Sequence, residues 1–275
     1  MGPEANLFKR GDIVAVIIVP GCAEADCSEC VSGLPQLCRQ GPRYGGGQDG
    51  FFAPYVKVTE RAAIKLPPNV SVAAGAVATD ACMTAYHAVV GRARVTRGET
   101  VLIFGLGGLG FNALQIALHL GARVIVSDKR QAVLNEAKRI GVRDEDIVSP
   151  DTEEIGEWIR NREVRVDKAI DFVSVPATFS AATDSVRLGG TVVSVGLLSS
   201  ELNIATSKMV RRELTILGSY AGTISDVKAC LDLISQGHLV PQVEEGSMGD
   251  FPTILEDLHH GKFKGRIVLI PDNDV

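Results

Sequence analysis

The chain has 275 residues, of which 45% are hydrophobic and 22% are charged, and its formal net charge at pH 7 is −5. This length is sufficient for a substantial core in one or two domains, and an acidic balance without a basic run argues against a nucleic-acid partner. The apolar runs, such as Ile13 to Val19, have strand length, and no hydrophobic signal core precedes them, so we expect no membrane contact and a cytoplasmic location.

Four of the six cysteines crowd into one stretch near the N-terminus. They form the pattern C-x4-C-x2-C-x7-C and are Cys22, Cys27, Cys30 and Cys38. The short gaps favour tight loops, and Gly33 and Pro35 bend the longest one, so four thiolates can converge on one tetrahedral ion. In a reducing compartment zinc is favoured over disulfides. The stretch predicts a closed structural zinc site, and the alternative is a surface loop with free or partly paired thiols.

An alanine-rich segment from Val72 to Val90 follows a turn at Pro67-Pro68. Ser71 directly precedes the segment and is a residue type that caps helices. We therefore expect a helix that begins after Ser71. His87, within this helix, is interpreted as a packed histidine, because the sequence supplies no catalytic partners for it.

The stretch Thr100 to Gly110 combines a β-prone apolar run with a Gly-x-Gly-x-x-Gly string, and a segment with helical apolar spacing follows it. In such a turn the first glycine permits the bend, the second lets backbone approach a diphosphate, and the third brings the helix close to the strand. The N-terminus of the helix then offers N–H groups to the phosphates. The stretch predicts a dinucleotide-binding turn made by Gly105, Gly107, Gly108, Leu109 and Gly110. A glycine-rich corner in an unrelated α/β domain is the alternative.

A second apolar strand, Arg123 to Ser127, ends in Asp128, which lies eighteen positions after Gly110. An acidic residue near this spacing is expected to hold the adenosine ribose hydroxyls and to repel a 2′-phosphate. The sequence therefore favours NAD over NADP. Lys129 and Arg130 follow directly and keep NADP open as an alternative, and Lys129 is counted among the cofactor-binding residues.

Apolar strands alternate with helical segments from Cys82 to about Tyr220. The predicted strands are Val101 to Phe104, Val124 to Ser127, Ile147-Val148, Lys168 to Val173, Thr191 to Val195 and Leu214 to Leu217. The predicted helices are Phe111 to Leu120, Gln131 to Ile140, Glu153 to Arg160, Thr178 to Arg187 and Ser207 to Arg211. This alternation predicts an α/β fold with a doubly wound parallel sheet and right-handed crossovers. Two helices, Ser225 to Gln236 and Ile254 to His259, and a closing strand complete the chain.

Several motifs together resemble those of the zinc-containing alcohol dehydrogenases of the medium-chain dehydrogenase/reductase superfamily. Gly11 to Val16 is similar to the family's GDxVxV strand, Gly50 to Val56 to its GGFAEYV element, and Gly261 to Leu269 to its C-terminal strand. With the cysteine stretch and the glycine string, the resemblance covers essentially the whole chain. One departure is the C-x4-C spacing of Cys22 and Cys27, where the family has two intervening residues.

The resemblance implies a Rossmann domain at 82–220 and a partial GroES-like, β-rich catalytic domain at 1–81 and 221–275 that carries the cysteine zinc lobe. It implies hydride transfer between a small alcohol, aldehyde or ketone and NAD(H). Arg266 is expected to reach the diphosphate. Strand-end residues are expected to face the ribose and nicotinamide, namely Val173, Val195, Gly196 and Leu197. Val173 and Val195 are also expected to be buried strand residues.

The family's catalytic zinc takes a cysteine, a histidine in a Gly-His-Glu motif, and a third ligand that falls at Asp80 here. The cysteine and the Gly-His-Glu motif are not in this sequence. Asp80 is therefore a candidate zinc ligand, with a helix-capping aspartate as the alternative. We expect the chain to lack an N-terminal segment and to have impaired zinc-dependent activity, because one carboxylate holds zinc only weakly.

The sequence leaves two other functions open. One is a zinc-independent NADPH reductase of quinones or enoyl compounds, against which Asp128 and the cysteine stretch count. The other is a non-catalytic dinucleotide-binding or interaction protein. The family pairs sheets across the sixth strand, so a homodimer or homotetramer through Leu214 to Leu217 is expected.

Overall fold

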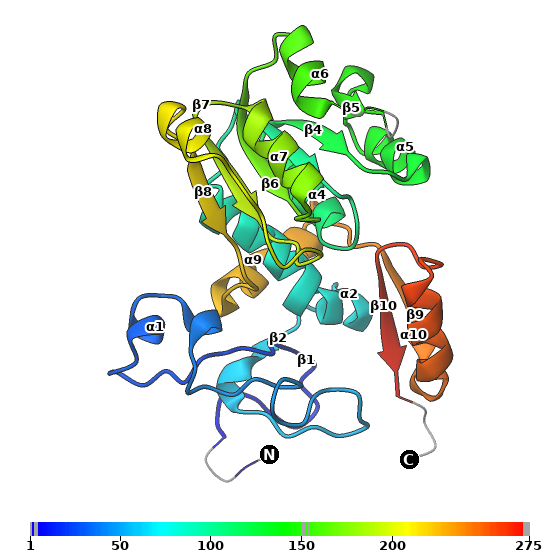
Figure 1. Cartoon of the computed structure of the whole chain (residues 1–275). Coiled ribbons are helices and arrows are strands. Elements are labelled where there is room, and N and C mark those ends of the chain that lie inside the picture. Colours follow the sequence, from blue (N-terminus) through cyan, green and yellow to red (C-terminus); the bar gives the residue numbers. More distant parts are fainter. Residues whose placement is uncertain (1, 3–4, 150–151, 153, 272–275) are drawn as a thin grey trace. The chain divides into compact units, whose positions relative to one another are not determined.

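A computed structural model of the chain describes residues 2, 5–149, 152 and 154–271. The described residues of 1–83 and 221–275 form one compact unit, and those of 84–220 form a second (Figure 1). No helix among the described residues has both the length and the apolar character needed to cross a membrane.

A six-stranded parallel sheet forms the centre of the 84–220 unit (Figure 1). In spatial order its strands are β5 (Ile147–Val148), β4 (Arg123–Ser127), β3 (Thr100–Phe104), β6 (Val166–Asp171), β7 (Val186–Ser194) and β8 (Thr215–Gly218). The chain order reverses between β3 and β6, and the carboxyl ends of strands at such a switch point form the ligand-binding edge of α/β sheets. The predicted doubly wound sheet is confirmed.

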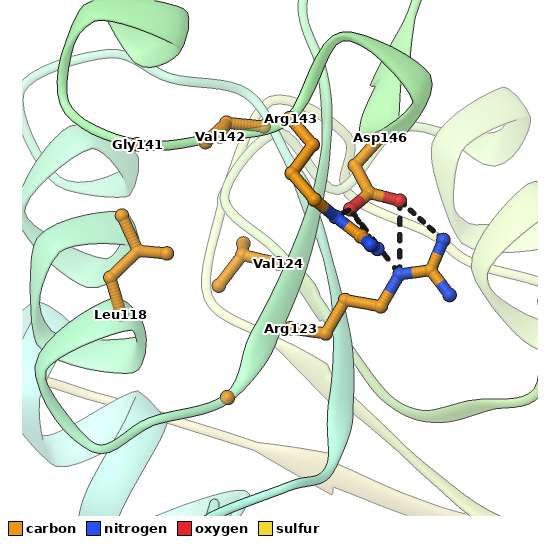
Figure 2. A pocket seen from close by; sticks show the side chains of 8 residues that line it. Leu118, Arg123, Val124, Gly141, Val142, Arg143 and Asp146 are labelled. Carbon is orange, nitrogen blue, oxygen red and sulfur yellow. Dashed lines mark hydrogen bonds and ion pairs between the residues drawn. The ribbon is translucent and has the colours of Figure 1, made fainter.

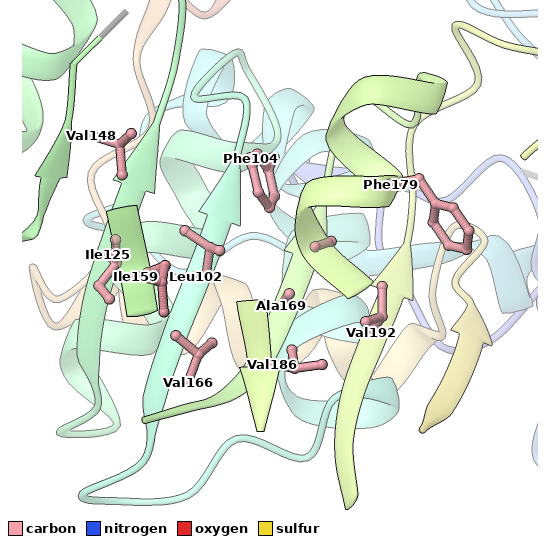
Figure 3. Packing of buried hydrophobic residues seen from close by; sticks show 11 residues of the cluster. Leu102, Phe104, Ile125, Val148, Ile159, Val166, Ala169, Phe179, Val186 and Val192 are labelled. Atoms are coloured by element: carbon pink, nitrogen blue, oxygen red, sulfur yellow. The ribbon is translucent and has the colours of Figure 1, made fainter. Parts of the chain in front are cut away.

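Helices cover both faces of this sheet. They are α4 (Gly110–His119), α5 (Gln131–Arg139), α6 (Ile155–Asn161), α7 (Pro176–Ser185) and α8 (Thr206–Arg211). Helices α6 and α7 pack together, and their residues Ile159 and Phe179 belong to one buried cluster with Leu102 and Phe104 of β3 (Figure 3). Helix α4 packs against β3 and β4. Strand β3 is therefore buried on both faces, which explains its unbroken apolar run.

The 1–83 and 221–275 unit contains two small sheets. Strand β1 (Val14–Val16) pairs antiparallel with β2 (Ala63–Lys65), and β9 (Val243–Ser247) pairs parallel with β10 (Arg266–Ile270). The helices are α1 (Ser28–Val31), α2 (Val72–Val77), α9 (Ile224–Ser235) and α10 (Phe251–His259). Strand β9 is not predicted from the sequence, because two glutamates and a glycine interrupt its apolar pattern.

The predicted helix from Val72 to Val90 is instead an alternation of helix types. Helix α2 is followed by a π-helical turn at Ala78–Cys82, by α3 (Met83–Tyr86) and by a second π-helical turn at His87–Arg92. The predicted cap is confirmed, since the Ser71 hydroxyl accepts a 3.2 Å hydrogen bond from the amide of Ala74. Local hydrogen bonds accompany the irregularity: the Thr79 hydroxyl donates to the carbonyl of Ala76 at 2.8 Å and so competes with the α-helical pattern.

Candidate functional sites

The four cysteines converge, as predicted. Their sulfur atoms all lie within 4.8 Å of one another. The Sγ atoms of Cys22 and Cys30 are 3.7 Å apart, and those of Cys27 and Cys38 are also 3.7 Å apart. Four sulfurs at about 2.3 Å from a central zinc ion form a tetrahedron with edges of about 3.8 Å. The spacing and the all-sulfur donor set therefore fit a closed zinc site.

The longer spacing between Cys22 and Cys27 is absorbed locally. Ala23 takes a left-handed conformation with φ of 66°, and the amide of Cys27 closes a turn by donating to the carbonyl of Glu24 at 3.2 Å. Gly21 is required on the inner side, because a Cβ atom there would lie 2.9 Å from the Cys30 sulfur. The two extra residues bulge outward, and the first cysteine keeps its place among the other three.

The cysteine lobe, residues 22–38, has the electrostatics of a cation site. Burial raises the pKa of Cys38, but backbone N–H groups, with that of Gly41 at 3.2 Å first among them, outweigh it and lower the pKa to about 6. The backbone N–H of Cys30 lowers the pKa of Cys27, but burial and the neighbouring thiols outweigh this and raise it to about 12. Four thiolates this close repel one another unless a cation neutralises them.

The three glycines of the second motif have different surroundings, as their predicted roles require. Gly105 has φ of +80°, and a Cβ atom there would lie 2.6 Å from the Cγ2 atom of Val173. At Gly110, where α4 begins, a Cβ atom would lie 1.8 Å from the carbonyl oxygen of Gly105. A Cβ atom at Gly107 would meet nothing within 4 Å. Packing therefore demands the outer two glycines, whereas the middle one borders open space.

Asp128 lies at the carboxyl end of β4 and is tied to the glycine turn. Its Oδ2 atom accepts a 2.7 Å hydrogen bond from the amide of Leu106. Its Oδ1 atom accepts a 2.9 Å hydrogen bond from the amide of Arg130, whose Nε and Nη2 atoms also donate to the carboxylate at 2.9 Å each. Burial raises the pKa of Asp128, but Arg130 and the two amides outweigh it and lower the pKa overall.

Sequence reasoning missed the importance of Asp171, the last residue of β6. Its fully buried side chain accepts hydrogen bonds from the amides of Val173 and Ser174, at 2.9 and 2.8 Å, and from the Thr178 hydroxyl at 2.7 Å. Burial raises the pKa of this carboxyl. The carboxylate ends the strand two residues before the predicted end at Val173. An aspartate at a strand end, with a threonine seven positions later, is the sequence signal for this loop.

The predicted strand-end residues of β6 and β7 do come together. The amide of Val195 donates to the carbonyl of Asp171 at 2.9 Å, and a Cβ atom at Gly196 would lie 2.3 Å from the Val173 carbonyl oxygen. Val173 also lies against Gly105, whereas Leu197 is 86% exposed. Val173 and Val195 are half-buried residues in the loops just beyond the strands, so the expectation that they are buried strand residues is only partly met.

The remaining predicted site residues are Lys129, Asp80 and Arg266. Lys129 is exposed beside Asp128. Burial and the charge of Asp80 raise the pKa of the Cys82 thiol to about 12, whereas the charge of Arg266 lowers it. Asp80 and Arg266 therefore both lie near this buried thiol. Among the described residues, the four cysteines are the one group of three or more His, Cys, Asp or Glu side chains arranged to hold a metal. Asp80 belongs to no such group among the described residues, and its role as a zinc ligand stays a prediction.

A cavity of about 250 Å³ lies at the amino ends of β4 and β5, away from the carboxyl ends of the strands, where the glycine turn lies (Figure 2). Arg123 and Arg143 both contact the buried carboxylate of Asp146, at 2.6 and 2.7 Å. The side chain of Asp146 is only 2% exposed. These ion pairs join the first residue of β4 to the turn before β5, so we assign them a structural role.

Comparisons with known proteins agree with the fold. Residues 108–236 match the family model of zinc-binding dehydrogenases, and residues 1–68 match that of the alcohol dehydrogenase GroES-like domain. The fold class is therefore confirmed as a Rossmann sheet combined with a GroES-like domain. The class of protein is that of the zinc-binding dehydrogenases.

Individual relatives narrow this class. An alcohol dehydrogenase of Geobacillus stearothermophilus is 30% identical over 276 residues, covering 99% of this chain and 80% of that protein. The structure of acetophenone reductase from Geotrichum candidum in complex with NAD is 34% identical, with a TM-score of 0.86, over 98% of this chain and 76% of that one. The alcohol dehydrogenase of the hyperthermophilic archaeon Aeropyrum pernix is 29% identical, with a TM-score of 0.87, over 98% and 79%. The chain belongs to the zinc-containing alcohol dehydrogenase family.

Proposed function

We propose that the chain is an oxidoreductase that transfers a hydride between NAD(H) and an alcohol or carbonyl substrate. The observation that carries this proposal is the open space at Gly107, between two glycines that packing makes obligatory, at the switch point of the sheet. A diphosphate needs such an unobstructed approach to backbone. Family membership and the relative solved with NAD support the same cofactor.

In this proposal the dinucleotide lies along the carboxyl ends of the strands. The turn of Gly105, Gly107, Gly108, Leu109 and Gly110 and the N-terminus of α4 bind the diphosphate, and Asp128 binds the adenosine ribose. Lys129 and Arg266 supply positive charge to the same cofactor. The half-buried strand-end residues Val173, Val195 and Gly196, with the exposed Leu197 beside them, position the ribose and nicotinamide and exclude water from them. The bound nicotinamide supplies or accepts the hydride.

The cysteine lobe has a structural role in this proposal. Cys22, Cys27, Cys30 and Cys38 provide four sulfur ligands and leave no coordination position for a substrate. Asp80 stays a candidate residue at the reacting centre. We derive no catalytic step through a metal there, because the described residues offer it no complete set of ligands.

Substrate class and organisation follow the family. We propose small alcohols, aldehydes and ketones as substrates, with residues 1–81 and 221–275 acting as the catalytic domain and 82–220 as the dinucleotide-binding domain. A homodimer or homotetramer through β8 is proposed because the family pairs sheets across its sixth strand and β8 is one of the two edge strands of this sheet. The cytoplasm suits a site of reduced thiolates.

The test is calorimetric titration of the purified chain with NADH, together with turnover of alcohols. In Gly107→Ala we expect an unchanged melting temperature but a Kd for NADH about tenfold higher, because the methyl group meets the diphosphate and no protein atom. Gly46→Ala is the matched control, since a Cβ atom there meets only ordinary contacts at 3.8 Å and Gly46 is exposed in the other compact unit. A wild-type chain that binds neither NADH nor NADPH refutes the proposal. Binding without turnover of any alcohol favours the non-catalytic alternative.

A further inference from the structure

The carboxylate of Asp128 has no open acceptor position. A carboxylate offers about four lone-pair sites, two on each oxygen. On Oδ1 they are used by the amide and the Nε atom of Arg130, and on Oδ2 by the amide of Leu106 and the Nη2 atom of Arg130. Ribose hydroxyls that donate to Asp128 must therefore displace a donor that is already there.

The four donors differ in how easily they can leave. Two are backbone amides, and the amide of Leu106 is part of the glycine turn, so losing it would disturb the phosphate site itself. The other two belong to the guanidinium of Arg130, whose side chain is 54% exposed while that of Asp128 is 6% exposed. The guanidinium can swing into solvent at the modest cost of a partly exposed ion pair. Arg130 is thus the replaceable partner.

Its departure would open the two positions that a ribose needs. The Nε atom leaves one acceptor site on Oδ1, and the Nη2 atom leaves one on Oδ2. Two neighbouring hydroxyls of a ribose can donate to both oxygens of one carboxylate, as the two nitrogens of a guanidinium fork do. We propose that Arg130 occupies the adenosine-ribose position of the free protein and competes with the cofactor for Asp128. This inference rests on the proposed dinucleotide function.

The competition bears on the choice between the two nicotinamide cofactors. NAD must displace Arg130 and gains nothing from the released guanidinium. In NADP a phosphate takes the place of the 2′-hydroxyl, so one of the two donors to Asp128 is lost and the phosphate is repelled by the carboxylate. This phosphate can, however, bind a free guanidinium through charge-assisted hydrogen bonds. Arg130 therefore weakens NAD binding and strengthens NADP binding. It is a specificity-determining residue that reduces the difference in affinity between NAD and NADP.

The test compares Arg130→Ala with the wild type by fluorescence titration with NADH and NADPH. We expect the Kd for NADH to fall by about threefold to fivefold, the contribution of a partly exposed ion pair, and the Kd for NADPH to rise by about tenfold. Arg139→Ala is the matched control, because Arg139 lies on α5, is 74% exposed and pairs with Glu136. It should change neither Kd.

A second pair of probes tests the displacement itself. AMP has both ribose hydroxyls, whereas 2′-deoxy-AMP has one. Arg130→Ala should bind AMP more tightly than the wild type does and should gain little for 2′-deoxy-AMP. An unchanged or higher Kd for NADH in folded Arg130→Ala overturns the inference, because Arg130 would then be neutral or a cofactor ligand. A wild type that binds no dinucleotide refutes the proposed function instead, so the two failures are distinguishable.

Discussion

The cysteine lobe and the glycine turn are two binding sites built on opposite physical principles. The ligands of the lobe come from one short stretch, and helix α1 within it buries no residue. The glycine turn is set between β3 and α4, whose apolar residues are almost all buried. The first site depends on what it binds, because four close thiolates need a cation. The second is shaped by the protein core before any ligand arrives.

This difference indicates which perturbations should separate the two sites. Loss of a thiolate should disrupt the structure of the lobe, whereas loss of a core side chain should disrupt the glycine turn. The single tryptophan of the chain, Trp158, packs against the core of the sheet. Its fluorescence therefore reports on the unit that contains the glycine turn, and zinc content reports on the lobe.

Removing one sulfur ligand should have the largest effect. In the wild type we expect about one zinc ion per chain. In Cys38→Ser we expect this zinc to be lost on dialysis, because only three of the four sulfur ligands remain. The effect should be large, since structural zinc contributes about 10–16 kcal/mol in small zinc domains. Zinc is measured by mass spectrometry. Cys230→Ala is the control, because Cys230 is buried in α9 outside the lobe. Full zinc content in Cys38→Ser would show that the four cysteines do not form the site.

Removing a large side chain from the core of the sheet should have the next largest effect. Phe104 is 1% exposed at the end of β3, directly before the glycine turn. We expect Phe104→Ala to lower the free energy of unfolding by about 3–5 kcal/mol, measured by Trp158 fluorescence in urea. Phe52→Ala, at a side chain 72% exposed, should change it little. Zinc content should be normal in both, and zinc loss in Phe104→Ala would contradict the separation of the two sites.

The glycine turn itself gives a sharper test of preformed shape. In Gly110→Ala the new methyl group would meet the carbonyl oxygen of Gly105, 1.8 Å away, so the turn must open. We expect a loss of about 1–3 kcal/mol in stability together with weaker NADH binding. Gly107→Ala should weaken binding alone. Equal stability losses in the two variants would mean that Gly107 does not border open space.

The two sites were predictable from the sequence because their determinants are local. The cysteines lie close together in the chain, and the strand, glycines and helix of the second motif are consecutive. The missed features depend on contacts that spacing does not encode. Asp171 organises a loop through amides that follow it, and Arg130 turns back on Asp128. Strand β9 was missed because pairing with β10, rather than an apolar pattern, makes it a strand.

Acid should reveal the smallest effect, at the Asp128 and Arg130 pair. Burial raises the pKa of Asp128, but Arg130 and two amides lower it overall. A carboxyl whose pKa is lower in the folded than in the unfolded chain stabilises the fold above the unfolded pKa of about 3.9. This stabilisation is lost as pH falls through the lowered pKa.

Because Arg130 is about half exposed, we expect its share to be below about 1 kcal/mol. Arg130→Ala should be slightly less stable than the wild type at pH 6, and the difference should shrink below about pH 4. Urea unfolding followed by Trp158 fluorescence measures this difference in the free energy of unfolding. Trp158 reports on the unit of the sheet, so loss of zinc from the cysteine lobe in acid does not interfere. A difference that grows in acid would mean that Arg130 stabilises the protonated carboxyl. The glycine turn would then lack the charged anchor that the ion pair gives it.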